Sequence, residues 1–193
     1  MPNYRIFSNE NKPLPQLQLN TYQSPSAAAP AEASASQAGR LFTAGATNSA
    51  TLGLLGGSSI ITIQLTNPAG SGRTAFISRI SGGINVSLSL LSSFSGAMTI
   101  IRNGALTGPT TLTAANLNFA SSNTSLMTVR SSTSASTGGT SILSMPLAAG
   151  PLEYNEFGDF IIPSGQSFTL TISGALSVAG VLASTANLVW WEV

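Results

Sequence analysis

The sequence predicts an all-β protein: an antiparallel sandwich of two sheets, of the jelly-roll type, with an extended N-terminal arm. Beyond residue 40, short runs of β-branched and other apolar residues alternate with polar residues at the two-residue period of a strand. Turns rich in glycine and asparagine separate these runs at short intervals. We find no capped stretch with the 3.6-residue period of an amphipathic helix, so no helix beyond a single turn is expected.

Residues 1–40 are predicted to be an arm that connects subunits, because they contain five of the ten prolines and end in an Ala/Ser-rich spacer at 24–39. Leu14, Leu17 and Leu19 are its apolar anchors. In an extended segment Leu17 and Leu19 share one face. Such a segment can add as a strand to the edge of a sheet, in its own subunit or in another. A flexible linker with a chance alternation is the alternative.

The body is expected to comprise residues 41–193, with its first strand at 59–66, where every second residue is Ile or Leu. An Asn-Pro-Ala-Gly turn ends this strand, and another follows at 74–80. A Gly-Gly pair precedes 84–90, which alternates apolar and polar residues and so predicts one face toward the core. A strand at 97–102 ends in an Asn-Gly pair, a strong hairpin signal.

The middle of the body gives weaker strand signals, and its end gives clear ones. Short strands among polar loops are expected at 106–117, 125–130 and 141–147. The last strands are expected at 160–163, 167–173 and 186–193. Eight or nine short antiparallel strands joined by glycine-containing turns predict two packed sheets, and a jelly roll is the arrangement that we expect.

The surface of the body is predicted to be covered largely by copies of the same chain. Charged residues make up 7% of the sequence, whereas roughly 25% is usual for a soluble domain. A monomer normally needs charge to stay apart from its copies. A neutral secreted domain is the alternative. The net charge is +1 and the arginines are scattered, so no nucleic-acid partner is expected.

The composition also excludes several kinds of chemistry. The chain has no cysteine, and therefore neither disulfides nor thiolate metal sites. It has no histidine, the commonest general base and metal ligand, and its single lysine, Lys12, lies in the arm. We therefore expect a protein whose subunits associate non-covalently, with no enzymatic activity and no cofactor. The N-terminus does not resemble a secretory signal, and the uncharged stretch from Arg40 to Arg73 is too often interrupted to span a membrane, so no membrane partner is expected.

Glu153, Glu156 and Asp159 form the single acidic cluster of the sequence. Three carboxylates within seven residues could ligate a hard cation such as Ca²⁺, or could include the acid pair of a glycosidase. The pattern lacks the spacing of an EF-hand. A solvated loop that pairs with an arginine, in its own or a neighbouring subunit, is the interpretation that we favour.

Trp190 and Trp191 are adjacent in the last predicted strand. Neighbouring side chains of a strand point to opposite faces of the sheet, so one tryptophan is expected in the core and the other at a surface. A contact with another subunit or with the arm is the favoured role of the outer tryptophan. A stacking platform for a glycan is the alternative.

Four segments of the body carry a resemblance to a known group of proteins: LTNPAGSGR at Leu65–Arg73, RISGG at 79–83, GDFIIPSG at Gly158–Gly165 and WWE at Trp190–Glu192. With them the body resembles small jelly-roll structural proteins of spore-forming Gram-positive bacteria and their phages, which occur as subunits of spore-surface fibres and as virion decorations. The similarity spans most of residues 50–193 and consists of turn and strand signatures. It implies a non-enzymatic subunit that polymerises through an N-terminal extension. The chain departs from the cysteine-linked appendage subunits because it has no cysteine.

The sequence therefore predicts a self-assembling structural subunit of a non-covalent surface filament or appendage, joined through its N-terminal arm. The resemblance implies a place on the endospore surface or exosporium, or on a virion. The expected partners are copies of the same chain in a helical or head-to-tail array, together with an anchoring or tip protein. The alternative is a phage decoration protein or a receptor- or glycan-binding module, in which the exposed tryptophan contacts the ligand.

Overall fold

The structure is a computed structural model that describes residues 31–88, 92–155 and 159–193. The predicted arm anchors Leu14, Leu17 and Leu19, and the acidic residue Glu156, lie outside the described residues. The described chain is almost entirely β, with a single helix, α1 (Ala31–Gln37). The strands are β1 (Leu41–Leu52), β2 (Gly57–Thr66), β3 (Ala75–Leu88), β4 (Phe94–Arg102), β5 (Thr110–Leu112), β6 (Ala115–Asn116), β7 (Thr128–Ser132), β8 (Thr140–Leu147), β9 (Gly150–Asn155), β10 (Ile161–Ile162), β11 (Ser167–Leu176) and β12 (Gly180–Glu192).

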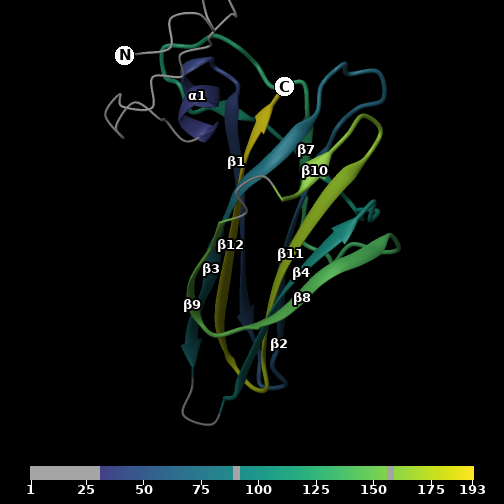
Figure 1. The fold of residues 1–193 in the computed structure, drawn as a ribbon. Coiled ribbons are helices and arrows are strands. Elements are labelled where there is room, and N and C mark those ends of the chain that lie inside the picture. Colours follow the sequence, from purple (N-terminus) through teal and green to yellow (C-terminus); the bar gives the residue numbers. More distant parts are fainter. Residues whose placement is uncertain (1–30, 89–91, 156–158) are drawn as a thin grey trace, which may run out of the picture. The chain divides into compact units, whose positions relative to one another are not determined.

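The strands form two antiparallel sheets packed face to face (Figure 1). The β12 sheet has the order β10-β3-β12-β1-β6, and β9 also pairs with β3. The β11 sheet has the order β5-β7-β2-β11-β4-β8. The pairs are nested: β1 with β12, β2 with β11, β3 with β9 and β4 with β8. This nested pairing of early strands with late ones is the winding of a jelly roll, and the predicted two-sheet sandwich is confirmed.

The core lies between the two sheets and follows the predicted alternation. Ile61, Ile63 and Leu65 of β2 are buried, as are the alternating residues Leu170 and Ile172 of β11. Each fully buried side chain of this size contributes about 1.5–3 kcal/mol to folding through removal of apolar surface from water. The residues between them lie on the other face of the sheet and are polar; Thr62 and Thr171 are buried there, share a hydrogen bond of 2.9 Å, and Thr62 also donates to Ser134 O. One register shift would exchange the two faces and place these hydroxyls in the apolar core.

β1 is the main strand that the sequence did not reveal, since the first strand was expected at 59–66. It pairs with β12 along its whole length, from Leu41 opposite Trp191 to Leu52 opposite Gly180. Its inward residues after Phe42 are mostly alanines, with Asn48 among them, so the apolar alternation is weak. Gly45 fits its place because the side chain of Asn187 on β12 lies over it, and a Cβ there would collide with the Asn187 amide oxygen.

Helix α1 was not predicted either, because residues 24–39 were expected to be a spacer. Its buried residue Ala35 packs against Leu41 and Val189 on the outer face of the β12 sheet. The helix ends in a Schellman motif: Arg40 N donates to Ala35 O at 2.8 Å, and Gly39, with a φ of 65°, donates to Ser36 O at 2.9 Å. The compact unit therefore runs from Ala31 to Val193 and includes part of the predicted arm.

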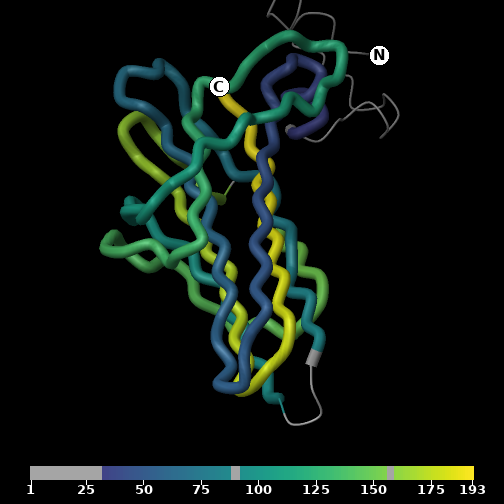
Figure 2. The backbone as a smooth tube through the Cα atoms, turned by 180° about the vertical axis from the view of Figure 1, so that it is seen from behind, coloured from purple at the N-terminus to yellow at the C-terminus, as the bar shows by residue number. Residues whose placement is uncertain are grey.

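The body has two distinct ends (Figures 1 and 2). The hairpin end is formed by the β1–β2 turn (53–56) and the β11–β12 turn (177–179), each of which passes from one sheet to the other. The α1 end contains α1, Val193 and the turn before β11 (163–166). The long strands β1, β2, β11 and β12 connect the two ends.

Two of the segments on which the resemblance rests meet at the α1 end. Asn67 is fully buried, and its Nδ2 donates to Arg73 O at 2.8 Å and to Ile162 O at 2.9 Å. Gly165 N donates to Asn67 O at 2.8 Å, and Gly70 N donates to Ser164 Oγ at 2.8 Å. The Asn-Pro-Ala-Gly turn and the Pro-Ser-Gly turn therefore form one hydrogen-bonded unit. The folded structure itself accounts for the residue types in these two turns.

Candidate functional site

The acidic cluster is divided in the structure. Glu153 on β9 forms an ion pair with Arg79 on the neighbouring β3, with 3.9 Å between Oε1 and Nη1. The two side chains are about half exposed, at 59% and 47%, and an exposed pair of this kind contributes less than about 1 kcal/mol. Asp159 is exposed near β10. Within residues 31–88, 92–155 and 159–193, no three His, Cys, Asp or Glu residues are grouped closely enough to hold a metal ion.

The two tryptophans lie on opposite faces of the β12 sheet. Trp190 is fully buried, and its ring lies 6.2 Å from that of Phe42. Trp191 is partly buried on the outer face and stacks on Phe76 of β3, with ring centroids 4.2 Å apart and planes 9° apart. The expected division between core and surface is present. Trp191 also packs against the cluster that α1 forms with the sheet through Ala35, so Phe76 and this cluster cover part of its indole.

Glu192 is a buried carboxylate that the sequence did not single out. It is 3% exposed. Ser125 Oγ and Trp190 Nε1 donate to its Oε1 at 2.5 and 3.1 Å, and Leu126 N donates to its Oε2 at 3.2 Å. Three donors satisfy the buried charge, which would otherwise be costly. The carboxylate thus fastens the loop before β7 to the last strand, and its role is structural.

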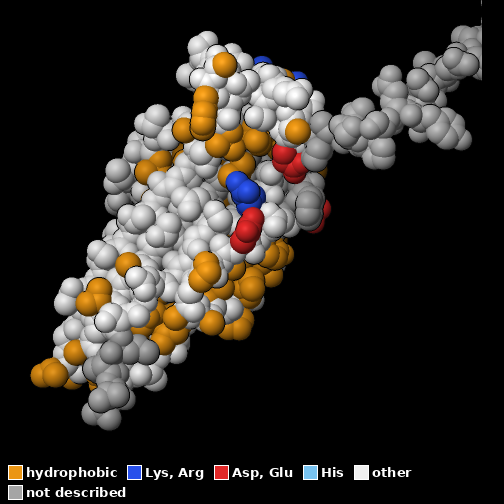
Figure 3. All heavy atoms as spheres, turned by 90° about the vertical axis from the view of Figure 1, so that its left-hand side faces the viewer, with side chains coloured by type: hydrophobic (Ala, Val, Ile, Leu, Met, Phe, Trp, Pro, Cys, Tyr) orange, Lys and Arg blue, Asp and Glu red, His pale blue; other side chains and the backbone are white. Residues whose placement is uncertain are grey.

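Charge is distributed unevenly along the body. In the β12 sheet the charged side chain nearest the hairpin end is Glu153, opposite Ser81, and in the β11 sheet it is Arg130, opposite Gln64. The half of the described body toward the hairpin end has no charged side chain, and Figure 3 shows this for one face. The charged residues of the described chain are Glu32, Arg40, Arg73, Arg79, Arg102, Arg130, Glu153, Asp159 and Glu192.

Most outward-facing residues of this uncharged half are small, with Val181 on the β12 sheet and Ile60 on the β11 sheet as larger apolar exceptions. On the β12 sheet the small residues include Thr47, Ser49 and Thr185. On the β11 sheet, serines and alanines of β2, β4 and β11 line a shallow depression of about 340 Å³. Both outer faces therefore carry mostly short side chains and no charge, so a second sheet or chain could approach either face closely.

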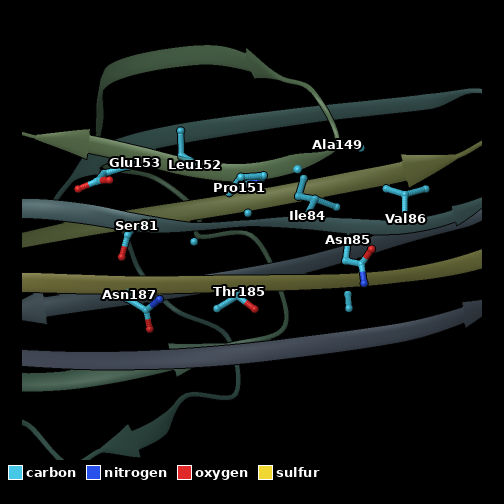
Figure 4. A pocket seen from close by; sticks show the side chains of 14 residues that line it. Ser81, Ile84, Asn85, Val86, Ala149, Pro151, Leu152, Glu153, Thr185 and Asn187 are labelled. Atoms are coloured by element: carbon cyan, nitrogen blue, oxygen red, sulfur yellow. The ribbon is translucent and has the colours of Figure 1, made fainter.

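A wider groove, of about 1130 Å³, lies on the outer face of the β12 sheet, over β3, β9 and β12 (Figure 4), and its lining combines polar residues with apolar ones such as Pro151 and Leu152. Gly83 in the middle of β3 lines the groove, and a Cβ at this position would collide with Gly150 O of the neighbouring strand β9. Hydroxyl and amide groups of Ser81, Asn85, Thr185 and Asn187 line the groove, and its carboxylate is Glu153. The lining offers hydrogen-bond donors and acceptors but includes no aromatic ring on which a sugar could stack.

An apolar groove of about 520 Å³ lies at the α1 end, where β10 approaches β4 and β11. Its apolar lining consists of Ile100, Ile142, Phe160, Ile161, Ile162, Pro163 and Phe168. Arg102 and Asp159, one charge of each sign, also line it, together with the polar residues Ser164, Gln166 and Ser167. Ile142 and Ile161 are 49% and 58% exposed, so the groove presents apolar surface to its surroundings.

Comparison of the chain with protein-family models, curated proteins and solved structures gives no match. Within the described residues, no helix has both the length and the apolar character needed to cross a membrane. The choice of a function therefore depends on the surface of the body and on the sequence of the arm.

Proposed function

We propose that this protein is a structural subunit that assembles with copies of itself into a non-covalent surface filament or appendage, in which the N-terminal arm joins one subunit to the next. The observation that supports it most is the uncharged half of the body, together with its low, neutral outer faces. Burial of a charge between subunits is costly. A surface without charge can be covered by copies without that cost and without repulsion.

The arm supplies the connection between subunits. It precedes Ala31 at the α1 end, and its apolar anchors are Leu14, Leu17 and Leu19. Thirty residues can span up to about 100 Å if fully extended, at roughly 3.3 Å per residue. An arm that binds the next subunit makes a head-to-tail contact, and such a contact gives a helical filament unless its rotation closes a ring.

The link between subunits is non-covalent in this proposal. The chain contains no cysteine, and its single lysine lies outside the body. Apolar burial, strand pairing and shape must therefore hold the copies together. The proposed place is the outer surface of an endospore or a virion, with an anchoring or tip protein as a further partner; it rests only on the turn and strand segments that carry the resemblance.

The wide groove on the β12 sheet, through the polar part of its lining, favours a second candidate function, that of a receptor- or glycan-binding module on a virion. Asn85, Thr185 and Asn187 offer neutral hydrogen-bonding groups of the kind that bind hydroxyl-rich ligands. In that case Asn187→Ala would abolish ligand binding on a glycan array, and changes in the arm would not affect it. The absence of an aromatic platform from the lining makes this candidate the weaker one.

Sedimentation velocity tests the proposed function. The full chain is compared with a variant in which Leu14, Leu17 and Leu19 are all replaced by Ser. Gln16→Ser with Gln18→Ser is the matched control, because these residues lie on the face opposite Leu17 and Leu19 in an extended segment. We expect large, polydisperse species from the full chain and the control, and monomers from the leucine variant. Monomers from all three, or large species from all three, would contradict the role of the arm.

A further inference from the structure

The turn at the hairpin end exposes two adjacent leucines. Leu54 and Leu55 are 86% and 97% exposed. The turn itself does not require them, because it is closed by Gly56 N donating to Gly53 O at 2.9 Å and by the φ of 69° at Gly56. Ser, Asn or Asp would form such a turn at least as well. A single exposed leucine needs no explanation, but a projecting pair that packs on nothing among residues 31–88, 92–155 and 159–193 indicates a contact elsewhere.

The apolar groove lies at the other end of the body. The strand register fixes this arrangement: the groove includes Arg102 and Phe168, which pair with each other at the start of β11, and Leu176 at the end of β11 pairs with Gly57, beside the leucine turn. The same chain therefore has an apolar projection at one end and an apolar recess at the opposite end. A volume of about 520 Å³ falls within the range of pockets that enclose small ligands, and so has room for two leucine side chains.

We propose that Leu54 and Leu55 of one copy insert into the apolar groove of the next copy. This inference rests on the proposed function, because two leucines bury far less surface than the roughly 1,200–2,000 Å² of a stable interface. The arm must therefore hold the copies together, and the leucine turn then fixes their axial position at high effective concentration.

The charge distribution favours a second copy as the occupant of the groove. The hairpin end has no charged side chain in the described chain, so its insertion places no charge beside Arg102 or Asp159. These two opposite charges leave the groove without net charge to repel or attract an ion. Because projection and recess lie at opposite ends, the contact is head-to-tail and has the same polarity as an arm-linked filament.

Disulfide trapping tests the contact in the full chain, which has no cysteine of its own. Leu55→Cys is mixed with Ile161→Cys and assembled under mild oxidation. Phe119→Cys is the matched control for the projection, because Phe119 is equally exposed, at 97%, but does not line the groove. A disulfide requires the two Cα atoms to be within about 7 Å. We expect a mixed dimer from Leu55→Cys with Ile161→Cys, at a yield about tenfold or more above that of Phe119→Cys with Ile161→Cys.

The outcomes separate this contact from the proposed function. If the chain assembles but Leu55→Cys links no better than the control, the tip contact is wrong while the arm-linked assembly stands. A link from Leu17→Cys to Ile161→Cys instead would assign the groove to the arm and overturn the inference. So would binding of the full chain to phosphatidylcholine vesicles that is lost in Leu54→Ser with Leu55→Ser, because the tip would then have a lipid surface as its partner. Absence of any assembly would overturn both proposals.

Discussion

Replacement of Glu192 is the substitution whose effect on stability the structure defines best. In Glu192→Ala, Ser125 Oγ, Leu126 N–H and the buried Trp190 Nε1–H lose their acceptor. The serine can rotate its hydroxyl toward another acceptor, but the two N–H groups are fixed. A buried donor without an acceptor costs about 1–3 kcal/mol, so we expect the free energy of unfolding to fall by about 3 kcal/mol.

A graded series makes this prediction sharper. Glu192→Gln can keep its oxygen at the Oε1 position, where it still accepts from Ser125 and Trp190, and its amide nitrogen then faces Leu126 N–H. In Glu192→Gln one donor loses its acceptor, whereas in Glu192→Ala three do. We therefore expect the free energy of unfolding to fall by about 1–2 kcal/mol. The exposed Asp159→Ala is the control, and it should change stability by less than about 0.5 kcal/mol.

Urea unfolding followed by tryptophan fluorescence measures these effects, because both tryptophans lie next to Glu192 in β12. At about 2–4 °C per kcal/mol for a chain of this size, the alanine variant should also melt about 6–12 °C lower. Chymotrypsin should cut faster at Phe119, because the loop that Glu192 holds is released. An alanine variant within about 0.5 kcal/mol of the parent, or no difference between Gln and Ala, would refute this account of the buried carboxylate.

Three further substitutions follow from the same contacts. Asn67→Ala removes the hydrogen bond that closes its own turn on Arg73 O and the one that joins this turn to Ile162 O, and should lower the free energy of unfolding by about 2–3 kcal/mol in urea titration; a loss below about 0.5 kcal/mol would show that neither bond is important for stability. Gly45→Val should destabilise the pairing of β1 with β12, and a melting temperature equal to that of the parent would show that Asn187 moves aside freely. Arg79→Ala breaks a half-exposed ion pair and should change the melting temperature by no more than about 2–4 °C, whereas a larger fall would mean that the pair matters more than its exposure indicates.

The sequence was informative where strands alternate large apolar residues with polar ones. β2 and the last part of β12 were predicted for this reason, and so was the two-sheet sandwich. β1 was missed because small residues such as Ala44 occupy its inner face, so its partner β12 rather than its own pattern determines the strand. Helix α1 was missed because it has only seven residues and depends on the contact of Ala35 with the sheet.

The surface features were less accessible to sequence analysis than the strands. The alternation of Trp190 and Trp191 followed from strand geometry, but the Phe76 stack depends on the register of β3 with β12. The donors to Glu192 come from Ser125 and Leu126, far away in the chain, and no local pattern announces them. The absence of charged side chains from the hairpin half of the described body is also visible only in the folded structure. The arginines are scattered along the sequence, and strand pairing places them in the other half.

Negative-stain electron microscopy of the full chain beside residues 31–193 tests the proposed assembly most directly. The shorter chain keeps α1 and its packing on the β12 sheet, and its folding can be checked by the fluorescence of Trp190 and Trp191. We expect filaments from the full chain and single particles from residues 31–193. Monomers or small closed rings from both chains, or filaments from the shorter one, would contradict an arm-linked polymer.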